Sequence, residues 1–203
     1  MKRLFICLFV SFLFLSGCNR TRCNKTIENL KTAIQGETTT SARYAAFAVR
    51  AEKEGHTKIA RLFEAVSKSE SIHAFNHQKV LMALGVKMVD FKPFIDVKTT
   101  KENLQVALDG ETYLTRSLYL LFFRDTRSEN VEVAETSFTW TYNTELKHLQ
   151  FFHDALSALE NFAENTLPLE YVICPVCGNI YDSSKLDDKC SICATSRFRF
   201  LKI

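Results

Sequence analysis

Glu70-Ser71-Ile72-His73 is the stretch that decides the fold, because its pattern returns 75 residues later as Glu145-Leu146-Lys147-His148. A carboxylate and an imidazole three positions apart on a helix project from the same face, close enough to bind one metal ion. Two such pairs predict two metal ions held between two helices.

A longer repeat surrounds these pairs. The segment ENLKTAIQGET at residues 28–38 corresponds to ENLQVALDGET at residues 102–112. Each copy contains a glutamate, Glu37 or Glu111, that precedes its Glu-x-x-His pair by 33 or 34 residues. Each half therefore reads as helix, turn, helix, with its ligands facing inward. The predicted ligands are Glu37, Glu70, His73, Glu111, Glu145 and His148.

Four carboxylates and two histidines in a four-helix bundle are the ligand set of ferritin-like di-iron and di-manganese proteins. The alternative is that each Glu-x-x-His pair is a salt bridge on a solvated helix. The apolar spacing around Glu70 places it on the buried face, however, and buried carboxylates are costly unless they are paired or bound to metal. Four carboxylates also balance the charge of two ferrous ions.

The hydrophobic pattern predicts four helices, over about 26–54, 57–84, 101–127 and 130–164. Residues 86–99 lack helical periodicity and are expected to form the long crossover between the two helix pairs. His56, His77 and His153 follow no ligand pattern and are expected at the surface or in turns.

The C-terminal residues carry a second motif. Cys174-Pro175-Val176-Cys177 and Cys190-Ser191-Ile192-Cys193 are separated by 12 residues, a spacing typical of two hairpins that enclose one metal ion in four thiolates. Iron and zinc both accept this cage, and disulfides are a third possibility in an oxidising compartment. So small a module cannot bury enough core to fold without its metal.

The N-terminus has the features of a secretory signal. Lys2 and Arg3 precede an apolar run of 12 residues, which is too short to span a bilayer. The run ends in Leu15-Ser16-Gly17-Cys18, which resembles the lipobox of bacterial lipoproteins. This resemblance implies cleavage before Cys18, lipidation of that cysteine and a mature protein anchored outside the cytoplasmic membrane in the cell envelope. An ordinary cleaved signal or an uncleaved anchor is the alternative.

These features divide the chain into five parts: a signal peptide (1–17), a tether (18–25), the bundle (26–164), a linker (165–171) and the cysteine module (172–203). The chain carries a formal net charge of +3, and removal of Lys2 and Arg3 leaves +1. Without a basic patch, nucleic acid is not expected as a partner.

The order of the two domains and the ligand spacing resemble the rubrerythrin family. The resemblance rests on the two Glu-x-x-His pairs, on Gly110-Glu111-Thr112-Tyr113 and on Cys174-Pro175-Val176-Cys177-Gly178. It implies an all-α, ferritin-like four-helix bundle followed by a small rubredoxin-like β/loop domain. It also implies two non-haem irons in the bundle, with Glu70 and Glu145 as bridging ligands, and one iron, or zinc, in the cysteine cage.

The same resemblance implies further roles. Glu37 and Glu111 correspond to terminal ligands, and Tyr44 and Tyr119 to tyrosines that hydrogen-bond the ligand carboxylates. The family's activity would be reduction of hydrogen peroxide to water, with electrons from an external donor passing through the rubredoxin-type iron. The family also forms homodimers in which one subunit's cysteine domain serves the other subunit's di-iron site.

Two departures from the family pattern bear on this activity. Leu114 stands where the family usually has a glutamate that changes ligation with oxidation state, which favours a ferroxidase or oxygen-reducing oxidase as an alternative. Ser191 and Ala194 replace the usual proline and glycine of the second cysteine hairpin. A non-enzymatic iron-binding lipoprotein with zinc in its cysteine module is a further alternative.

Overall fold

The computed structural model describes residues 23–87 and 92–203. The predicted signal peptide and the lipidation site Cys18 lie outside these residues. Within the described part of the chain, no helix combines the length and the apolar character that crossing a membrane requires.

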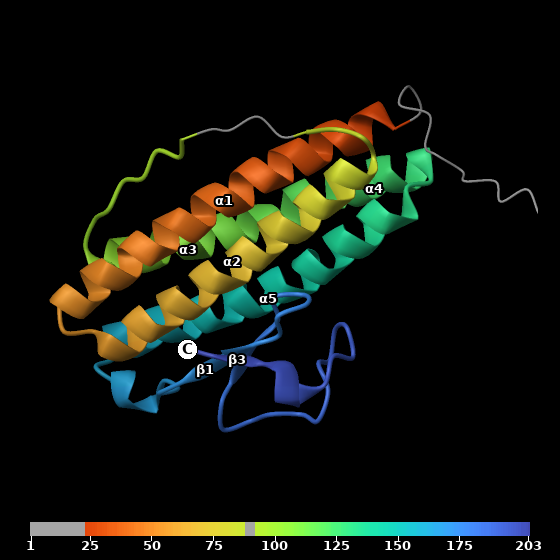
Figure 1. The fold of residues 1–203 in the computed structure, drawn as a ribbon. Helices are drawn as coiled ribbons and strands as arrows, with labels where there is room; N and C mark the ends of the chain where they lie inside the picture. The colour runs from red at the N-terminus through yellow and green to blue at the C-terminus, as the bar shows by residue number, and fades with distance from the viewer. Residues whose placement is uncertain (1–22, 88–91) are drawn as a thin grey trace, which may run out of the picture.

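The first two helices form an antiparallel hairpin, α1 (Asn24–Lys53) and α2 (Thr57–Ala83) (Figure 1). Gly55, with φ 88°, takes the left-handed conformation predicted for the helix stop. Helix α1 begins inside the predicted tether, and Cys23 is buried, so the tether prediction was too long at its C-terminal end. The carboxylate of Glu129 accepts hydrogen bonds from the backbone N–H groups of residues 25 and 26, which fixes this early start.

The connection after α2 leads to the opposite end of the bundle, where α3 (Thr100–Tyr113) begins (Figure 1). Its described parts lie along the outer side of α1, as expected of a crossover between two helix pairs. A capping box formed by Thr99 and Glu102 starts α3.

The prediction of one continuous α-helix over 101–127 was wrong at its centre. Helix α3 passes into a π-helical turn, η1 (Leu114–Leu118), before α4 (Tyr119–Glu129) continues in the same direction to a left-handed stop at Asn130. Leu114 is thus the first residue of the π turn.

The repeat explains this π turn. Glu37 precedes Tyr44 by seven residues, whereas Glu111 precedes Tyr119 by eight. One additional residue in a regular α-helix would rotate Tyr119 by about 100° away from the site. A π turn takes up the residue and keeps the tyrosine on the inner face.

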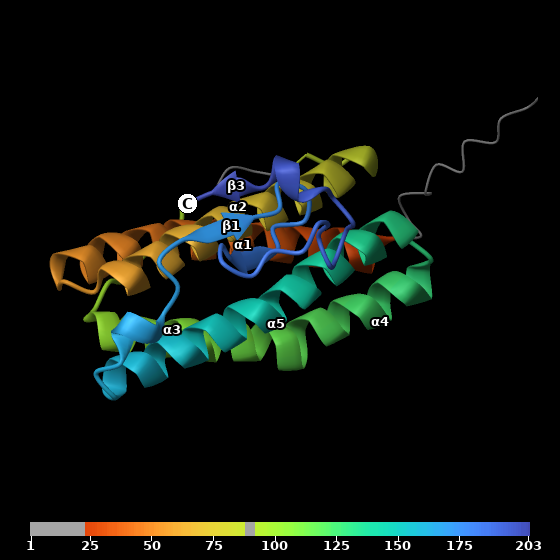
Figure 2. The same ribbon diagram turned by 90° about the horizontal axis from the view of Figure 1, so that it is seen from below.

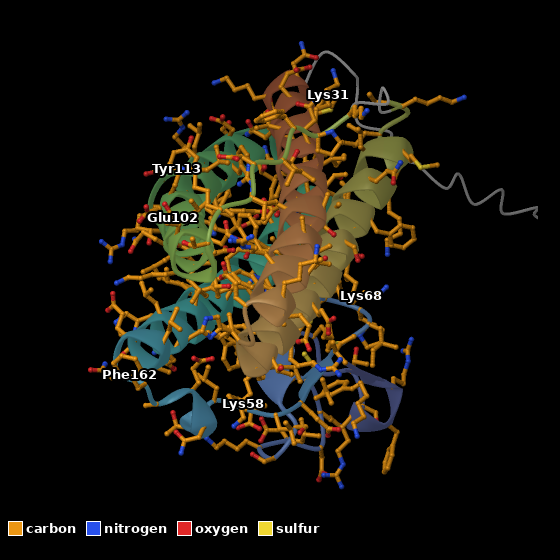
Figure 3. All side chains as sticks on the ribbon, turned by 90° about the vertical axis from the view of Figure 1, so that its left-hand side faces the viewer. Lys31, Lys58, Lys68, Glu102, Tyr113 and Phe162 are labelled. Atoms are coloured by element: carbon orange, nitrogen blue, oxygen red, sulfur yellow. The ribbon has the colours of Figure 1, made fainter. Side chains whose placement is uncertain are left out.

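The last long helix, α5 (Glu132–Glu160), is shorter than the predicted 130–164. It ends at Asn161, and a short 3₁₀ turn, η2 (Glu164–Thr166), follows. Phe162 has a positive φ of 53° and is 96% exposed, at the end of the bundle where Figure 3 labels it. The chain therefore leaves the helix pattern about four residues before the prediction.

Two aromatic clusters fill the bundle. One contains Tyr44, Phe47, Phe63 and Phe152, and the other contains Tyr119, Phe122 and Phe138. Each cluster includes one of the two tyrosines predicted to support the ligands. The predicted site lies between the clusters, in an interior that excludes water.

The cysteine module is a small antiparallel sheet with strand order β2-β1-β3, built from β1 (Tyr171–Ile173), β2 (Ile180–Asp182) and β3 (Leu201–Lys202). It lies against α2 and α5 (Figure 2). Residues 171, 173 and 180 share the first aromatic cluster of the bundle. The module and the bundle therefore have one continuous core in this chain.

Lys58 binds the linker between the bundle and the cysteine module and is labelled in Figure 3 near the junction of the two domains. Its Nζ donates to the carbonyl oxygens of Asn165 and Leu167, each at 2.7 Å. These bonds fix the direction in which the chain returns from the end of α5 to β1.

Candidate metal centre

The six predicted ligands meet at the middle of the bundle, contributed by α1, α2, α3 and α5. Glu37 is 2% exposed and the other five are fully buried. Ligand atoms of Glu37, Glu70, His73 and Glu145 lie within 4.8 Å of one another, as do those of Glu70, Glu111, Glu145 and His148. Glu70 and Glu145 belong to both groups. This overlap is the arrangement expected of two ions bridged by two shared carboxylates.

Both histidines point Nδ1 toward the shared carboxylates. His73 Nδ1 lies 2.9 Å from Glu70 Oε2 and 2.9 Å from Glu145 Oε1. His148 Nδ1 lies 2.7 Å from Glu145 Oε2 and 3.2 Å from Glu70 Oε1. The Nδ1 atoms are therefore the ligand nitrogens.

Each of the four carboxylates retains one buried oxygen without a hydrogen bond from the described protein atoms: Glu37 Oε2, Glu70 Oε1, Glu111 Oε2 and Glu145 Oε1. Two of these oxygens lie close to a histidine, but a single imidazole N–H cannot serve both carboxylates within its reach. Orphaned carboxylate oxygens are costly in a water-free interior unless cations bind them. The residues present therefore fit two divalent ions.

The two tyrosines predicted to hydrogen-bond the ligand carboxylates do so, and each bonds a carboxylate of the other half of the repeat. Tyr44 on α1 donates to Glu111 Oε1 at 2.7 Å, and Tyr119 on α4 donates to Glu37 Oε1 at 2.5 Å. One oxygen of each terminal carboxylate is thereby fixed, and the other is left for an ion.

Without metal, the site holds protons. Burial, and then the neighbouring carboxylates, raise the pKa values of Glu37 and Glu111 well above 4.5. Burial alone would lower the pKa of His73, but the carboxylates of Glu145 and Glu70 raise it. The metal-free site thus approaches neutrality by protonation, and metal binding must release those protons.

These shifts predict opposite pH trends for metal-free and metal-loaded protein. A group whose pKa is raised by folding stabilises the folded state below its unfolded pKa, and this contribution is lost as pH rises through the folded pKa. Metal-free protein should therefore lose stability as the pH rises above about 4.5, the ordinary pKa of these glutamates, whereas the loaded protein should not, because metal affinity rises as the ligands deprotonate. Melting temperatures of both forms across this range test the prediction. Parallel curves would contradict it.

Ser69, which precedes the shared Glu70, contacts both histidines. Its Oγ lies 3.4 Å from His73 Nε2 and 3.1 Å from His148 Nε2, and it donates to the carbonyl oxygen of Gly178 at 2.7 Å. A hydroxyl accepts two hydrogen bonds and donates one, so both imidazole N–H groups and the carbonyl can be satisfied together. Ser69 thereby holds both rings in the tautomer that leaves Nδ1 free for metal.

Replacing Ser69 by alanine should weaken metal binding by about 10- to 100-fold, the range typical of such supporting groups. Thr144→Ala is the matched control, because Thr144 occupies the equivalent position of the repeat but its hydroxyl bonds the carbonyl of Trp140 on its own helix. Competition with a chelator measures both affinities. Equal losses in the two variants would contradict the role given to Ser69.

The four predicted cysteines form the second site. Cys174 Sγ lies 3.4 Å from Cys193 Sγ, and Cys177 Sγ lies 3.4 Å from Cys190 Sγ. A disulfide would require about 2.05 Å, whereas a tetrahedral cage with bonds of about 2.3 Å separates its sulfurs by about 3.8 Å. The thiols are therefore arranged for a single four-thiolate metal rather than for two bridges.

The two cysteine hairpins have the same backbone form. Gly178 and Ala194 each follow the second cysteine of a hairpin, with φ of 84° and 58°, and each donates its N–H to the first cysteine's carbonyl at 2.9 Å. The alanine adopts the left-handed conformation in spite of its Cβ, at a cost of about 1–2 kcal/mol. Ala194 therefore changes the local energy of the loop but not its shape.

Gly178 also touches the bundle site. A Cβ at this position would lie 2.6 Å from His73 Nε2 and 3.0 Å from Ser69 Oγ. Together with the hydrogen bond from Ser69, this places the residue after Cys177 directly against a ligand of the two-ion site. Asn76 Nδ2 strengthens the contact by donating to the carbonyl of Val176 at 2.8 Å.

One of the three histidines expected at the surface or in turns is buried instead. His56 is half-buried at the start of α2 and pairs with Glu164, and His153 is exposed, but His77 is fully buried beside Tyr119. The apolar stripe of α2 continues at three- and four-residue spacing through position 77, a signal that could have placed it inside. Ser69 gives no such signal, because its role depends on a contact with Gly178 of the distant cysteine module.

Comparisons with known proteins agree with this geometry. A family model described as Rubrerythrin matches residues 28–159. Nigerythrin from Nitratidesulfovibrio vulgaris is 32% identical over 180 residues, covering 86% of this chain and 85% of that protein. Rubrerythrin-2 from Clostridium acetobutylicum is 30% identical over 176 residues, covering 86% of this chain and 95% of that protein.

Solved structures agree as well. A structure of nigerythrin in a mixed-valence state superposes with a TM-score of 0.78 and 31% identity, covering 88% of this chain and 86% of that chain. A fully reduced, all-ferrous nigerythrin gives the same TM-score with 30% identity. The fold, the carboxylate–histidine site and the four-cysteine module thus agree with both comparisons, and the chain belongs to the rubrerythrin family.

Proposed function

We propose that this protein reduces hydrogen peroxide to water, using electrons that an external donor delivers through the cysteine module. Members of the rubrerythrin family are di-iron oxidoreductases with a rubredoxin-like domain. The observation that carries the proposal for this chain is the contact between Gly178 and His73. It places the cysteine module, whose iron would carry one electron at a time, directly against the two-ion site of the bundle.

The chemistry needs two electrons and two protons for each peroxide, giving two waters. Two ferrous ions held by the six ligands would supply both electrons. The shared carboxylates of Glu70 and Glu145 would hold both ions, while Tyr44 and Tyr119 hold the carboxylates of Glu111 and Glu37 in orientation.

The connection between the two sites is short. It runs from Cys177 to Gly178 along the backbone, and from the Gly178 carbonyl through Ser69 Oγ to the Nε2 atoms of both histidines. Because Ser69 contacts both histidine rings, electrons that arrive at Ser69 can reach either ion position.

The test is stopped-flow mixing of anaerobically reduced protein with either peroxide or oxygen. The proposal expects oxidation of the two-ion site by peroxide, followed by re-reduction through the cysteine iron. A site that peroxide leaves fully ferrous would overturn the proposal.

Faster oxidation by oxygen than by peroxide would support the second candidate, a ferroxidase or oxygen-reducing oxidase. Leu114 favours it, because this side chain packs against the apolar cluster around Tyr119 and Phe122 and cannot act as a ligand. Elemental analysis that found zinc in the cysteine cage would favour the non-enzymatic alternative.

We further propose attachment to the envelope through lipid on Cys18, and a homodimer as in the family. In this chain the module packs on its own bundle, and a dimer could form the same contacts between subunits. The two arrangements differ in their response to dilution. The rate of electron transfer between the sites should be independent of protein concentration if the contact is within one chain, and should fall on dilution if it depends on a dissociable dimer.

A further inference from the structure

The two halves of the repeat support their tyrosines differently. At an offset of 75, His77 corresponds to Phe152. Phe152 packs its ring edge against Tyr44 at a centroid distance of 5.1 Å, so in that half an apolar ring lies beside the tyrosine. His77 Nε2 instead lies 3.2 Å from the hydroxyl oxygen of Tyr119.

His77 has two further polar partners, one at each ring nitrogen. Its Nδ1 lies 2.9 Å from Ser137 Oγ, and Thr141 Oγ1 lies 3.3 Å from Nε2. All of these groups are buried, and burial lowers the pKa of His77 to about 3, so the ring is neutral. A neutral imidazole has one N–H donor and one acceptor nitrogen.

The His77 tautomer with its proton on Nε2 satisfies these contacts, with that N–H shared between Tyr119 and Thr141. Tyr119 donates to Glu37, so its oxygen is left to accept from His77 Nε2–H. Nδ1 then accepts from the hydroxyl of Ser137. Each bond polarises the next, so Tyr119 becomes a stronger donor to Glu37 than Tyr44 is to Glu111.

We propose that His77 is a positioning residue that acts through Tyr119 on Glu37 and makes the two ion positions unequal. A stronger hydrogen bond from Tyr119 draws electron density away from the carboxylate of Glu37. Glu37 would then donate less electron density to the ion that it holds together with His73. The ion held by Glu111 and His148 would not feel this effect, because Tyr44, the donor to Glu111, packs against Phe152 and not against a histidine. The inference concerns the ion positions themselves and holds whichever oxidant the site uses.

The experiment compares His77→Phe, which copies the residue of the other half, with Phe152→Leu as the matched control. Both proteins are loaded with isotopically enriched iron and examined by Mössbauer spectroscopy, after metal analysis has verified full occupancy. In the wild type, the two ions should give two distinct signals. In His77→Phe one signal should move toward the other, whereas Phe152→Leu should leave their separation unchanged.

A second measurement does not need iron. Stepwise titration of metal-free protein with cobalt(II) should give two unequal affinities for the bundle, besides that of the cysteine site, whose thiolate complex has its own absorption. The ratio of the two bundle affinities should change by roughly 2- to 10-fold in His77→Phe, which corresponds to the free energy of one hydrogen bond. His77→Gln, which retains an N–H donor at similar reach, should restore the wild-type ratio. An unchanged ratio in His77→Phe, or an equal change in Phe152→Leu, would overturn the proposal.

If His77→Phe fails to fold, Tyr119→Phe provides the same test, because it removes the donor on which His77 acts. In Tyr119→Phe, Glu37 has no tyrosine donor while Glu111 keeps Tyr44, so the signal of the ion on the His73 side should shift in the direction expected for His77→Phe, and further. A signal that stays at its wild-type position in Tyr119→Phe would also overturn the proposal.

Discussion

Glu70→Gln should remove both metal ions from the bundle, because the carboxylate of Glu70 belongs to both ligand groups. The amide keeps the size of the side chain and one oxygen, but it loses the negative charge and the ability to bridge two cations. We expect metal in the bundle to fall from two ions per chain to nearly none, as measured by elemental analysis of protein whose cysteine site is counted separately.

The repeat supplies the controls. Glu145→Gln should behave like Glu70→Gln, because it removes the other shared carboxylate. Glu37→Gln removes a ligand that belongs to only one of the two groups, so it should weaken the binding of mainly one ion. Glu70→Gln protein that keeps one ion at full occupancy would show that the carboxylate is not shared.

Gly178→Ala should separate the cysteine module from the two-ion site. Its Cβ would come within 2.6 Å of His73 Nε2, and the residue has a φ of 84°, so the loop must move. We expect a loss of about 1–3 kcal/mol of stability from this overpacking, in addition to about 1–2 kcal/mol for the left-handed conformation. Electron transfer from the cysteine iron to the two-ion site should slow severalfold.

Gly55→Ala isolates the conformational part of this effect. Gly55 has a similar φ of 88°, but a Cβ there would meet no atom within 4 Å. The control should lose only the smaller amount of stability and transfer electrons at the wild-type rate. Stability is read from thermal unfolding, and transfer from the recovery of the reduced two-ion site after a pulse of oxidant. Equal transfer rates in the two variants would contradict the proposed connection.

The ligands were predictable because a metal site imposes spacing on helices. Glu70 and His73, three residues apart on a buried stripe, define one side of the site regardless of the surrounding residues, and duplication identified the rest. The cysteine cage was predictable for the same reason. Residues whose role depends on a partner on a distant element were not predictable. Ser69 and Gly178 are examples, because nothing in their spacing reveals that the cysteine module docks against α2.

The π turn is an intermediate case. The change in spacing between Glu111 and Tyr119 was present in the sequence, but hydrophobic periodicity averages over several turns and does not detect one additional residue. His77 was misplaced because it was assessed as a possible ligand rather than by its position on the stripe. Comparing the two halves residue by residue would have revealed both features.

Diffraction from crystals of the natively prepared protein, recorded at the iron absorption edge, tests the central claim most directly. The account predicts two anomalous peaks between Glu70 and Glu145, one on the His73 side and one on the His148 side, together with a peak inside the cysteine cage if that site holds iron. A single peak in the bundle, or none in fully metal-loaded protein, would contradict it.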